Sequence, residues 1–266
     1  LTVVGGLRYD DHSVFGSEIN PKLSLMYHLS DSAALRASAG RSFKSPTIRQ
    51  LYYNIPYQHG DYYVQSNRNL QPETGMGYSF SIEQWLLDGE LMTSFGLFRN
   101  DVDKMVIRED TGELYDGLPL REYRNVDEAV TQGAELTARW ERRAFSLAAA
   151  YTYTDSENKD SGLNLPYVPE HSLSLTPAYK WSQYGLGLSG TLSCVGKQYK
   201  DAGNSSQIDS HAVVDAKVYK ELDWKDLFFN KAVLSLAADN IFDSDKGDDA
   251  SFRTGRAFMF KLDMNF

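Results

Sequence analysis

Hydrophobic and polar side chains alternate with a period of two along most of this sequence. The final segment shows the pattern most clearly. Its large side chains are Phe258, Phe260, Leu262, Met264 and Phe266, and its polar ones are Lys261, Asp263 and Asn265. The same alternation recurs at 145–154, 172–181 and 212–218. A period of two is typical of a β-strand whose two faces meet different surroundings, and no amphipathic helical stretch of comparable length competes with it.

We expect about twelve strands, with boundaries good to a few residues. They begin near residues 1, 20, 33, 75, 90, 121, 144, 170, 185, 208, 231 and 252. Short connections lie at 30–32, 87–89, 141–143 and 182–184, and long polar ones lie at 44–74, 108–120, 156–169, 198–207 and 243–251. The connection 221–230 belongs with the short ones, lengthened by Trp224, Phe228 and Phe229, which we expect at a membrane interface.

Short turns at one end and long loops at the other are typical of bacterial outer-membrane barrels. Short and long connections alternate along the chain, and counting them back from the end places the C-terminus at the short-turn, periplasmic end. Pro177 interrupts one strand, because proline removes a hydrogen-bond donor from the sheet. The predicted fold is therefore an all-β, transmembrane antiparallel β-barrel, located in the bacterial outer membrane.

The composition agrees with such a barrel. Aromatic residues make up 13% of the chain, with 17 Tyr, while the mean hydropathy is only -0.44. A membrane barrel combines a lipid-facing apolar band and aromatic girdles with a polar lumen and polar loops. No apolar run approaches the roughly 18 residues that a spanning helix needs. No signal peptide opens the sequence, so we interpret it as a fragment or processed piece that lacks an N-terminal region.

Charge and metal-ligating residues narrow the function further. The formal charge of -9 argues against a nucleic-acid partner. Cys194 cannot form an internal disulfide, and we expect it to be a small buried hydrophobic residue. His12, His28, His171 and His211 are scattered without metal-ligand spacing. No metal site and no cofactor are therefore predicted.

Two acidic clusters in loops leave open the alternative of a Ca²⁺ site. One consists of Asp243, Asp245, Asp248 and Asp249, and the other of Glu109, Asp110, Glu113 and Asp116. Either could contribute oxygen ligands to a Ca²⁺ site, but neither has EF-hand spacing, and solvated loops are commoner. Charged residues on the strands are expected to form a polar lumen wall without catalytic roles. These are Arg36, Glu135, Arg139, Asp215, Lys217, Lys261 and Asp263.

Several short phrases stand out along the chain. In the first part they are Leu7-Arg8-Tyr9-Asp10, Pro21-Lys22-Leu23, Leu35-Arg36-Ala37-Ser38 and Gly40-Arg41-Ser42-Phe43-Lys44-Ser45-Pro46. Next come Asn67-Arg68-Asn69-Leu70-Gln71-Pro72-Glu73-Thr74 and Tyr123-Arg124-Asn125-Val126 with Gln132-Gly133-Ala134-Glu135. Asp239-Asn240-Ile241-Phe242-Asp243 follows, and Phe266 ends the chain after alternating aromatic residues.

In this order the phrases resemble the TonB-dependent receptor family. Phe43–Pro46 is similar to the family's F-[RK]-x-P box, and Asn67–Glu73 to its NPNLKPE box, with Arg68 in place of a proline. Asn125–Glu135 and Asn240–Asp243 are similar to its N-x-x-x-x-x-x-G-x-E and N-L-F-D strands. Phe266 resembles the terminal signal read by the barrel-assembly machinery.

The resemblance implies a barrel of 22 strands with a plugged lumen. Residues 1–266 would form its C-terminal portion, without the plug domain and the N-terminal strands. The partners implied are the TonB complex through the missing N-terminal region, outer-membrane lipid, the barrel-assembly machinery and a small metal-chelate ligand.

Candidate ligand-binding residues gather in the connection 44–74. They are Arg49, Tyr52, Tyr53, Tyr57, His59, Tyr62, Tyr63 and Arg68. Tyrosines suit a large planar or catecholate-like ligand, and arginines suit its carboxylates. The alternative is that the tyrosines belong to the aromatic girdle and to loop packing. Residues 45–51 indicate a short helical turn with Pro46 near its start.

His59 carries a separate hypothesis, because haem-importing relatives of this family carry an axial histidine in this stretch. The leading function is a receptor and gated transporter for an iron–siderophore complex, haem or cobalamin. The alternative is a self-contained small barrel acting as a passive channel, since an even number of strands can close. An outer-membrane enzyme such as a lipase is disfavoured, because no G-x-S-x-G motif or convincing Ser/His/Asp set is present.

Overall fold

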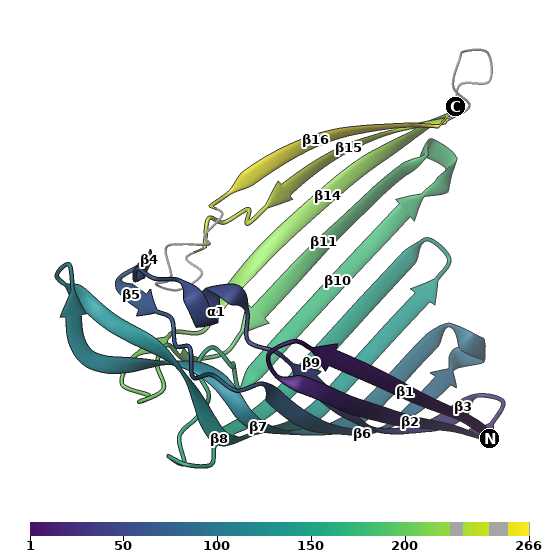
Figure 1. Cartoon of the computed structure of the whole chain (residues 1–266). Helices are drawn as coiled ribbons and strands as arrows, with labels where there is room; N and C mark the ends of the chain where they lie inside the picture. The colour runs from purple at the N-terminus through teal and green to yellow at the C-terminus, as the bar shows by residue number, and fades with distance from the viewer. Residues whose placement is uncertain (224–230, 245–254, 266) are drawn as a thin grey trace.

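The computed structural model describes residues 1–223, 231–244 and 255–265. Within these residues, twelve long antiparallel strands form one curved wall, each paired with its neighbours in chain order (Figure 1). The strands are β1 (Thr2–His12), β2 (Gly16–Ser30), β3 (Ala33–Lys44), β6 (Glu73–Leu86), β7 (Leu91–Tyr115), β8 (Leu118–Arg142), β9 (Phe145–Asn158), β10 (His171–Trp181), β11 (Leu186–Val195), β14 (His211–Asp223), β15 (Lys231–Asp239) and β16 (Ala257–Asn265). The prediction of an all-β fold with about twelve strands is confirmed.

The remaining elements are short and lie between these strands. They are α1 (Ile48–Tyr52), the 3₁₀ turns η1 (Leu87–Gly89) and η2 (Ser182–Tyr184), β4 (Tyr57–His59), β5 (Tyr62–Gln65), β12 (Gln198–Tyr199) and β13 (Gln207–Ile208). None of the helices in the described ranges has the length and apolar character that crossing a membrane requires.

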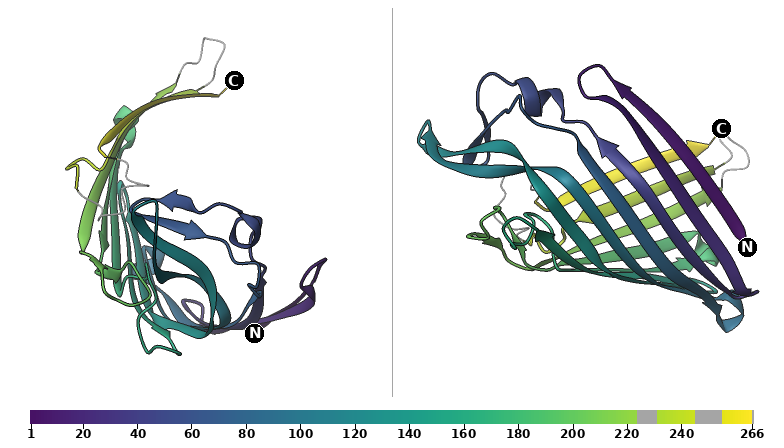
Figure 2. Two further views of the ribbon diagram at one scale, coloured as in Figure 1. Left: turned by 60° about the vertical axis from the view of Figure 1, so that its left-hand side comes forward. Right: turned by 60° about the horizontal axis from the view of Figure 1, so that its bottom comes forward.

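The wall is open. In the described part of the chain, β1 and β16 are the two edges of the sheet and do not pair with each other (Figure 2). This disagrees with the alternative of a closed twelve-stranded barrel. An open edge exposes a row of unpaired backbone groups, with which a further strand can pair.

One face of the wall is apolar from strand to strand. Directly opposite residues in an antiparallel pair point to the same face. The register runs Leu25–Ala37–Phe80–Leu97–Ala134 across β2, β3, β6, β7 and β8. Phe80 and Leu97 are 48% and 50% exposed. So large a row of exposed hydrophobic side chains requires an apolar neighbour, which a bilayer supplies.

The opposite face is polar. Arg36 Nε and Nη2 donate to the Glu83 carboxylate at 2.8 and 3.0 Å, and the Ser38 and Ser79 hydroxyls lie 2.9 Å apart. The charged wall residues predicted above lie on strands where they alternate with apolar residues, as Glu135 does with Leu136. Residues 45–72 lie on the concave side of the wall (Figure 2).

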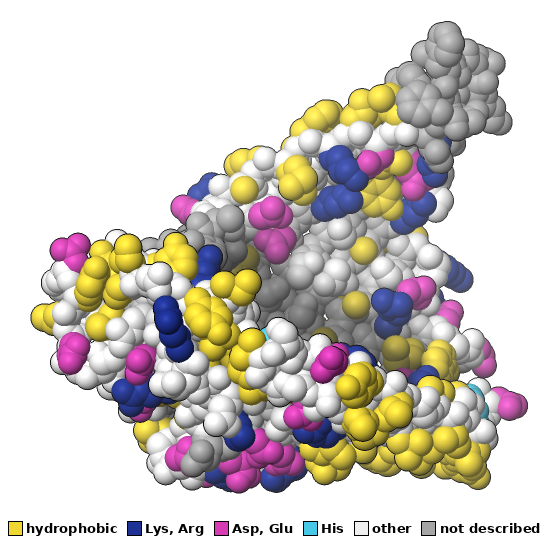
Figure 3. Space-filling view, in the orientation of Figure 1, with side chains coloured by type: hydrophobic (Ala, Val, Ile, Leu, Met, Phe, Trp, Pro, Cys, Tyr) yellow, Lys and Arg dark blue, Asp and Glu magenta, His cyan; other side chains and the backbone are white. Residues whose placement is uncertain are grey.

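The space-filling view looks into this hollow (Figure 3). Most of the side chains visible there are polar, with scattered charges of both signs. Hydrophobic side chains gather along the lower right edge, over the strands nearest the N-terminus. Cys194 lies on the apolar face opposite Leu173 and Ala212 and is only half-buried, so the expectation that it is a buried residue is wrong.

The connections differ from prediction at three places. Residues 108–120 are not a loop: β7 and β8 continue as a hairpin that turns at Asp116 and Gly117, both with positive φ. The first loop-side connection is short, because β2 begins at Gly16 rather than near residue 20. Residues 44–74 contain α1, β4 and β5 and are therefore not a single irregular loop.

The sorting of short turns to one end is confirmed at 31–32, 87–90, 143–144 and 182–185 (Figure 1). Pro177 lies within β10 opposite Leu147 of β9, and the pairing with β11 is interrupted beside it. The predicted interface residues Trp224, Phe228 and Phe229 lie outside the described residues, as do Asp245, Asp248, Asp249 and Phe266.

Candidate ligand-binding site

The long-loop end of the wall carries a set of packed segments that we call the crown. It comprises residues 45–72, the β7–β8 hairpin from 103 to 128, and the connections 159–170 and 196–210. Helix α1 opens it, with Thr47 as its N-cap. The Gln50 backbone N–H donates to Thr47 Oγ1 at 3.3 Å, and the Thr47 N–H donates to Gln50 Oε1 at 2.8 Å. This capping box confirms the predicted helical turn.

Residues 45–72 cross the concave side of the hairpin and are pinned to β8. Strand β5 runs parallel to β8, with Val64 opposite Arg121. Asn67 Nδ2 donates to the Tyr123 carbonyl at 3.0 Å, and the Gln71 N–H donates to Asn125 Oδ1 at 2.8 Å. These residues belong to two of the phrases singled out in the sequence. The two phrases therefore dock against each other and anchor the segment to the hairpin.

A cavity of about 420 Å³ opens between segment 45–72 and the hairpin. Its charged lining residues are all basic, and four of its others are aromatic rings. The basic residues are Arg49, Arg108, Arg121 and Lys200, and the ring-bearing ones are Tyr57, His59, Tyr123 and Tyr167. We call it the cationic cavity.

Tyr62 is 3% exposed and contacts three of the residues that line the cationic cavity. Arg108 Nη1 donates to the Tyr62 hydroxyl at 2.6 Å, the Arg121 guanidinium lies 3.9 Å from the ring centre, and the His59 ring stacks on it at 5.2 Å. Burial raises the pKa of the Tyr62 phenol well above its ordinary value, and Arg108 lowers it by a smaller amount. The phenol is therefore neutral, and the guanidinium charges remain available to an anionic ligand.

A pair of hydrogen-bonded tyrosines also lines the cationic cavity. The Tyr57 and Tyr123 hydroxyls lie 2.7 Å apart, and the Arg49 guanidinium lies 5.3 Å from the Tyr57 ring centre. Burial raises the pKa of Tyr123 to about 12, and the hydrogen bond to Tyr57 adds to the rise. Cationic groups over aromatic faces are attracted to the rings and give this part of the cavity a positive charge.

A larger cavity of about 760 Å³ adjoins the first one and shares Ile107, Arg121, Tyr167 and Lys200 with it. Most of its charged residues are acidic: Asp61, Glu109, Asp110, Asp160 and Asp201. We call it the acidic cavity. The two cavities thus carry opposite charge on either side of shared walls.

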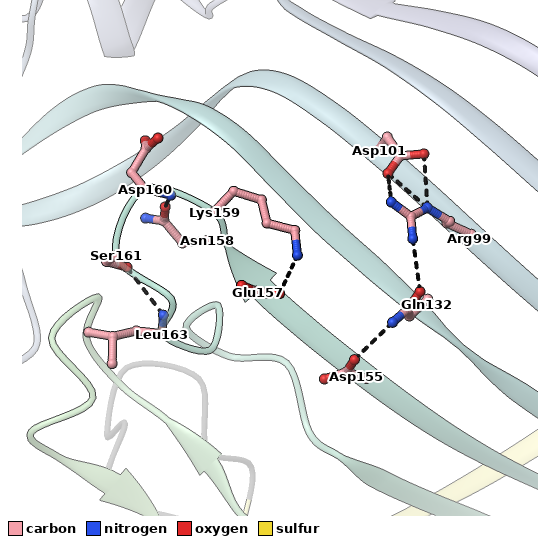
Figure 4. A network of polar contacts seen from close by, with 10 residues as sticks. All are labelled: Arg99, Asp101, Gln132, Asp155, Glu157, Asn158, Lys159, Asp160, Ser161 and Leu163. Atoms are coloured by element: carbon pink, nitrogen blue, oxygen red, sulfur yellow. Dashed lines mark hydrogen bonds and ion pairs between the residues drawn. The ribbon is translucent and has the colours of Figure 1, made fainter.

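Polar contacts order the loop that borders the acidic cavity (Figure 4). The Asn158 N–H donates to the Leu163 carbonyl at 2.8 Å, and the Asp160 N–H donates to Asn158 Oδ1 at 3.0 Å. Below the loop, a chain of contacts joins β7, β8 and β9: Arg99 bonds Asp101 and Gln132, and Gln132 bonds Asp155. The loop therefore adjoins a part of the wall in which side-chain hydrogen bonds connect three neighbouring strands.

The structure brings together four of the eight predicted binding residues. Arg49, Tyr57 and His59 line the cationic cavity, and Tyr62 lines the acidic one. The other four line neither cavity. The Tyr63 hydroxyl donates to the Asp116 carboxylate at the hairpin tip. The Arg68 guanidinium lies 5.7 Å from the centre of the Tyr52 ring, and Tyr53 is exposed. The binding role of these four residues stays a prediction.

Several lining residues were not predicted from the sequence. They are Arg108, Arg121, Tyr123, Tyr167 and Lys200. The alternation of side chains along β8 would have placed Arg121 and Tyr123 on the polar face, had residues 108–120 been recognised as strand. No cluster of three His, Cys, Asp or Glu side chains arranged for a metal ion occurs in the ranges 1–223, 231–244 and 255–265.

Comparison with known proteins tests the resemblance. The family model described as TonB dependent receptor-like, beta-barrel matches residues 1–241. The chain belongs to this family. Its members are transport receptors rather than enzymes, which agrees with the expectation that the chain is not a catalyst, and the outer-membrane location is confirmed.

The individual relatives are named for different ligands. The chain is 28% identical to the vitamin B12 transporter BtuB of Photobacterium profundum over 79% of its length, and 29% identical to the ferrienterobactin receptor of Escherichia coli over 74%. It spans only 32% and 28% of those two proteins. The ferric enterobactin receptor structure from Pseudomonas aeruginosa shows the same fold, with a TM-score of 0.71 at 22% identity, covering 98% of this chain and 42% of that one.

Proposed function

We propose that this chain forms the C-terminal portion of a 22-stranded receptor barrel that imports a ferric siderophore across the outer membrane. The open edges of the wall are the places where further strands would pair. A plug inside the concave, polar face and the TonB complex acting on that plug would supply gating and energy. These partners belong to the whole receptor, and the family membership of the chain supports them.

The observation that carries the ligand assignment is the cationic cavity. It presents four basic side chains and several aromatic rings, with no carboxylate among its described lining residues. A ferric catecholate complex is large, flat-sided and negatively charged, so it can stack on tyrosines and pair with arginines. Haem and cobalamin remain the second and third candidates. Haem is supported by His59, which lines the same cavity.

The test is a titration of the full-length receptor with a ferric tris-catecholate, haem and cobalamin, read by absorbance and tryptophan quenching. Binding of the catecholate and not of the other two is expected. Arg49→Gln should weaken that binding about tenfold, the effect of losing one charge-assisted contact. Arg143→Gln, at a short turn on the opposite end, is the matched control.

Each alternative has its own signature in the same titration. A Soret shift that disappears in His59→Ala would assign the receptor to haem. Tight cobalamin binding that ignores Arg49→Gln would contradict the catecholate assignment. Ion conductance by the chain reconstituted alone in planar bilayers would favour the passive-channel alternative.

A further inference from the structure

The two cavities of the crown differ in charge, and this difference limits the kind of ligand that fills both. An anionic ligand is attracted to the cationic cavity, but the same ligand is repelled when it extends past Arg121 into the acidic cavity. The acidic cavity is the larger one, at about 760 Å³ against 420 Å³. A purely anionic chelate therefore leaves most of the available volume unused.

Three carboxylates of the acidic cavity, those of Asp61, Asp110 and Asp201, form no ion pair with basic side chains in the described part of the chain. Glu109 differs, because Arg124 Nη1 lies 3.1 Å from its Oε2. Like charges gathered around one cavity raise the negative potential there, and this potential attracts a cation.

Loop architecture accounts for part of this arrangement. Asp201 accepts hydrogen bonds from Ser205 and Ser206 at 2.8 to 3.2 Å, and Asp110 accepts one from the Gly112 N–H at 2.8 Å. These bonds orient two carboxylates without cancelling their charge. No described side chain or backbone group donates a hydrogen bond to Asp61. Loop structure therefore does not explain why Asp61 faces this cavity.

We propose that the ligand of this receptor is amphoteric: its anionic, metal-chelating part occupies the cationic cavity, and a cationic amine occupies the acidic cavity beside Asp61, Asp110 and Asp201. The inference rests on the proposed function. An alkylammonium group carries three N–H donors and pairs with carboxylates at short distance. Arg121, which lines both cavities, separates the two charge environments.

The experiment compares two probes that differ in one group. The first is the ferric complex of a catecholamide chelator with a free primary amine, and the second is the same complex with that amine acetylated. Both are titrated into the full-length receptor at low salt. We expect the amine probe to bind about fivefold more tightly, the effect of one solvent-accessible charge pair.

Charge-removing variants identify the source of that preference. Asp61→Asn combined with Asp110→Asn should reduce the ratio of the two dissociation constants to about one, while the acetylated probe binds as before. Asp88→Asn is the matched control: Asp88 lies in the η1 turn at the opposite end of the wall, in a left-handed conformation that asparagine also adopts. It should leave the ratio unchanged.

Salt supplies a second readout. At about 1 M salt the screening length falls to about 3 Å, so the amine preference should vanish while stacking of the catecholates persists. Equal binding of the two probes to the unmodified receptor at low salt overturns the inference and leaves the proposed function standing. A preference that survives the double substitution also overturns it. Failure of both probes to bind removes the proposed function and the inference together.

Discussion

The wall and the crown of this protein are held together by different kinds of interaction. The wall depends on long backbone ladders and on an apolar face that needs lipid. The crown depends on individual side-chain contacts, such as Asn125 with Gln71 and Tyr57 with Tyr123. The effect of a substitution in the wall should therefore depend on which face carries the residue. In the crown it should depend on which contact partner is lost.

The largest effect is expected from a charge on the apolar face of the wall. Leu136→Arg should lower the free energy of unfolding in lipid vesicles by about 2–4 kcal/mol, because the guanidinium must enter hydrocarbon. Leu136 is 52% exposed in the protein alone, so no packed core is lost. Glu135→Arg, one residue away on the polar face, is the control and should cost much less. Equal costs would contradict the assignment of the faces.

Two glycines on the polar face give the next effect. A Cβ on Gly133 would overlap the Tyr153 carbonyl oxygen of the next strand, whereas a Cβ on Gly187 would meet only the Tyr219 ring. Backbone cannot move without breaking the ladder, but a ring can rotate. Gly133→Ala should therefore cost about 1–3 kcal/mol in urea-induced unfolding. Gly187→Ala should cost less, and the reverse order would show that β9 adapts more readily than Tyr219.

The wall could be predicted from the sequence more completely than the crown. Strand number and the two faces were predictable, since the alternation of Phe258, Phe260 and Leu262 with Lys261 and Asp263 records an apolar and a polar environment. The hairpin at 108–120 was not, because it extends beyond the wall at the long-loop end and carries charged residues and glycines without a regular alternation. It is supported by local contacts, including Arg124 with Glu109 and Glu122.

The candidate site was predictable only in part, for a related reason. The tyrosines and arginines of residues 44–74 were visible as a dense group within one connection. Tyr167 and Lys200 come from other connections, and nothing in their own surroundings marks them. Only the path of residues 45–72 across the hairpin to β8 brings them to the cavity, and that path depends on contacts such as Asn67 with the Tyr123 carbonyl.

The crown should loosen locally when its anchor is removed. Asn125 bonds both the N–H and the carbonyl of Gln71, so Asn125→Ala leaves backbone groups without partners at a cost of about 1–3 kcal/mol. Hydrogen exchange should speed up in residues 45–72 while the unfolding midpoint of the wall changes little. Asn100→Ala is the control, since Asn100 makes one 3.3 Å contact with Thr131 in the wall. Unchanged exchange would show that β5 pairing alone holds the segment.

The smallest effect concerns the buried phenols of the crown at high pH. The pKa of Tyr123 is raised from 10.0 to about 12, so the folded state favours the neutral phenol. This contribution to stability is complete below pH 10 and is lost as the pH rises toward 12, because the unfolded chain releases the proton first.

Tyr123→Phe should therefore reduce the loss of crown stability at alkaline pH. The loss is measured as the increase in the rate of limited proteolysis within residues 45–72 between pH 9 and pH 11. The substitution also removes one hydrogen bond, worth about 1 kcal/mol at any pH. Absorbance at the tyrosinate band supplies the direct check: the amplitude of tyrosine ionisation near pH 10 should be the same in the variant as in the unmodified protein. A smaller amplitude near pH 10 in Tyr123→Phe would mean that this phenol is solvated, and that the cationic cavity is open to water on its Tyr57 side.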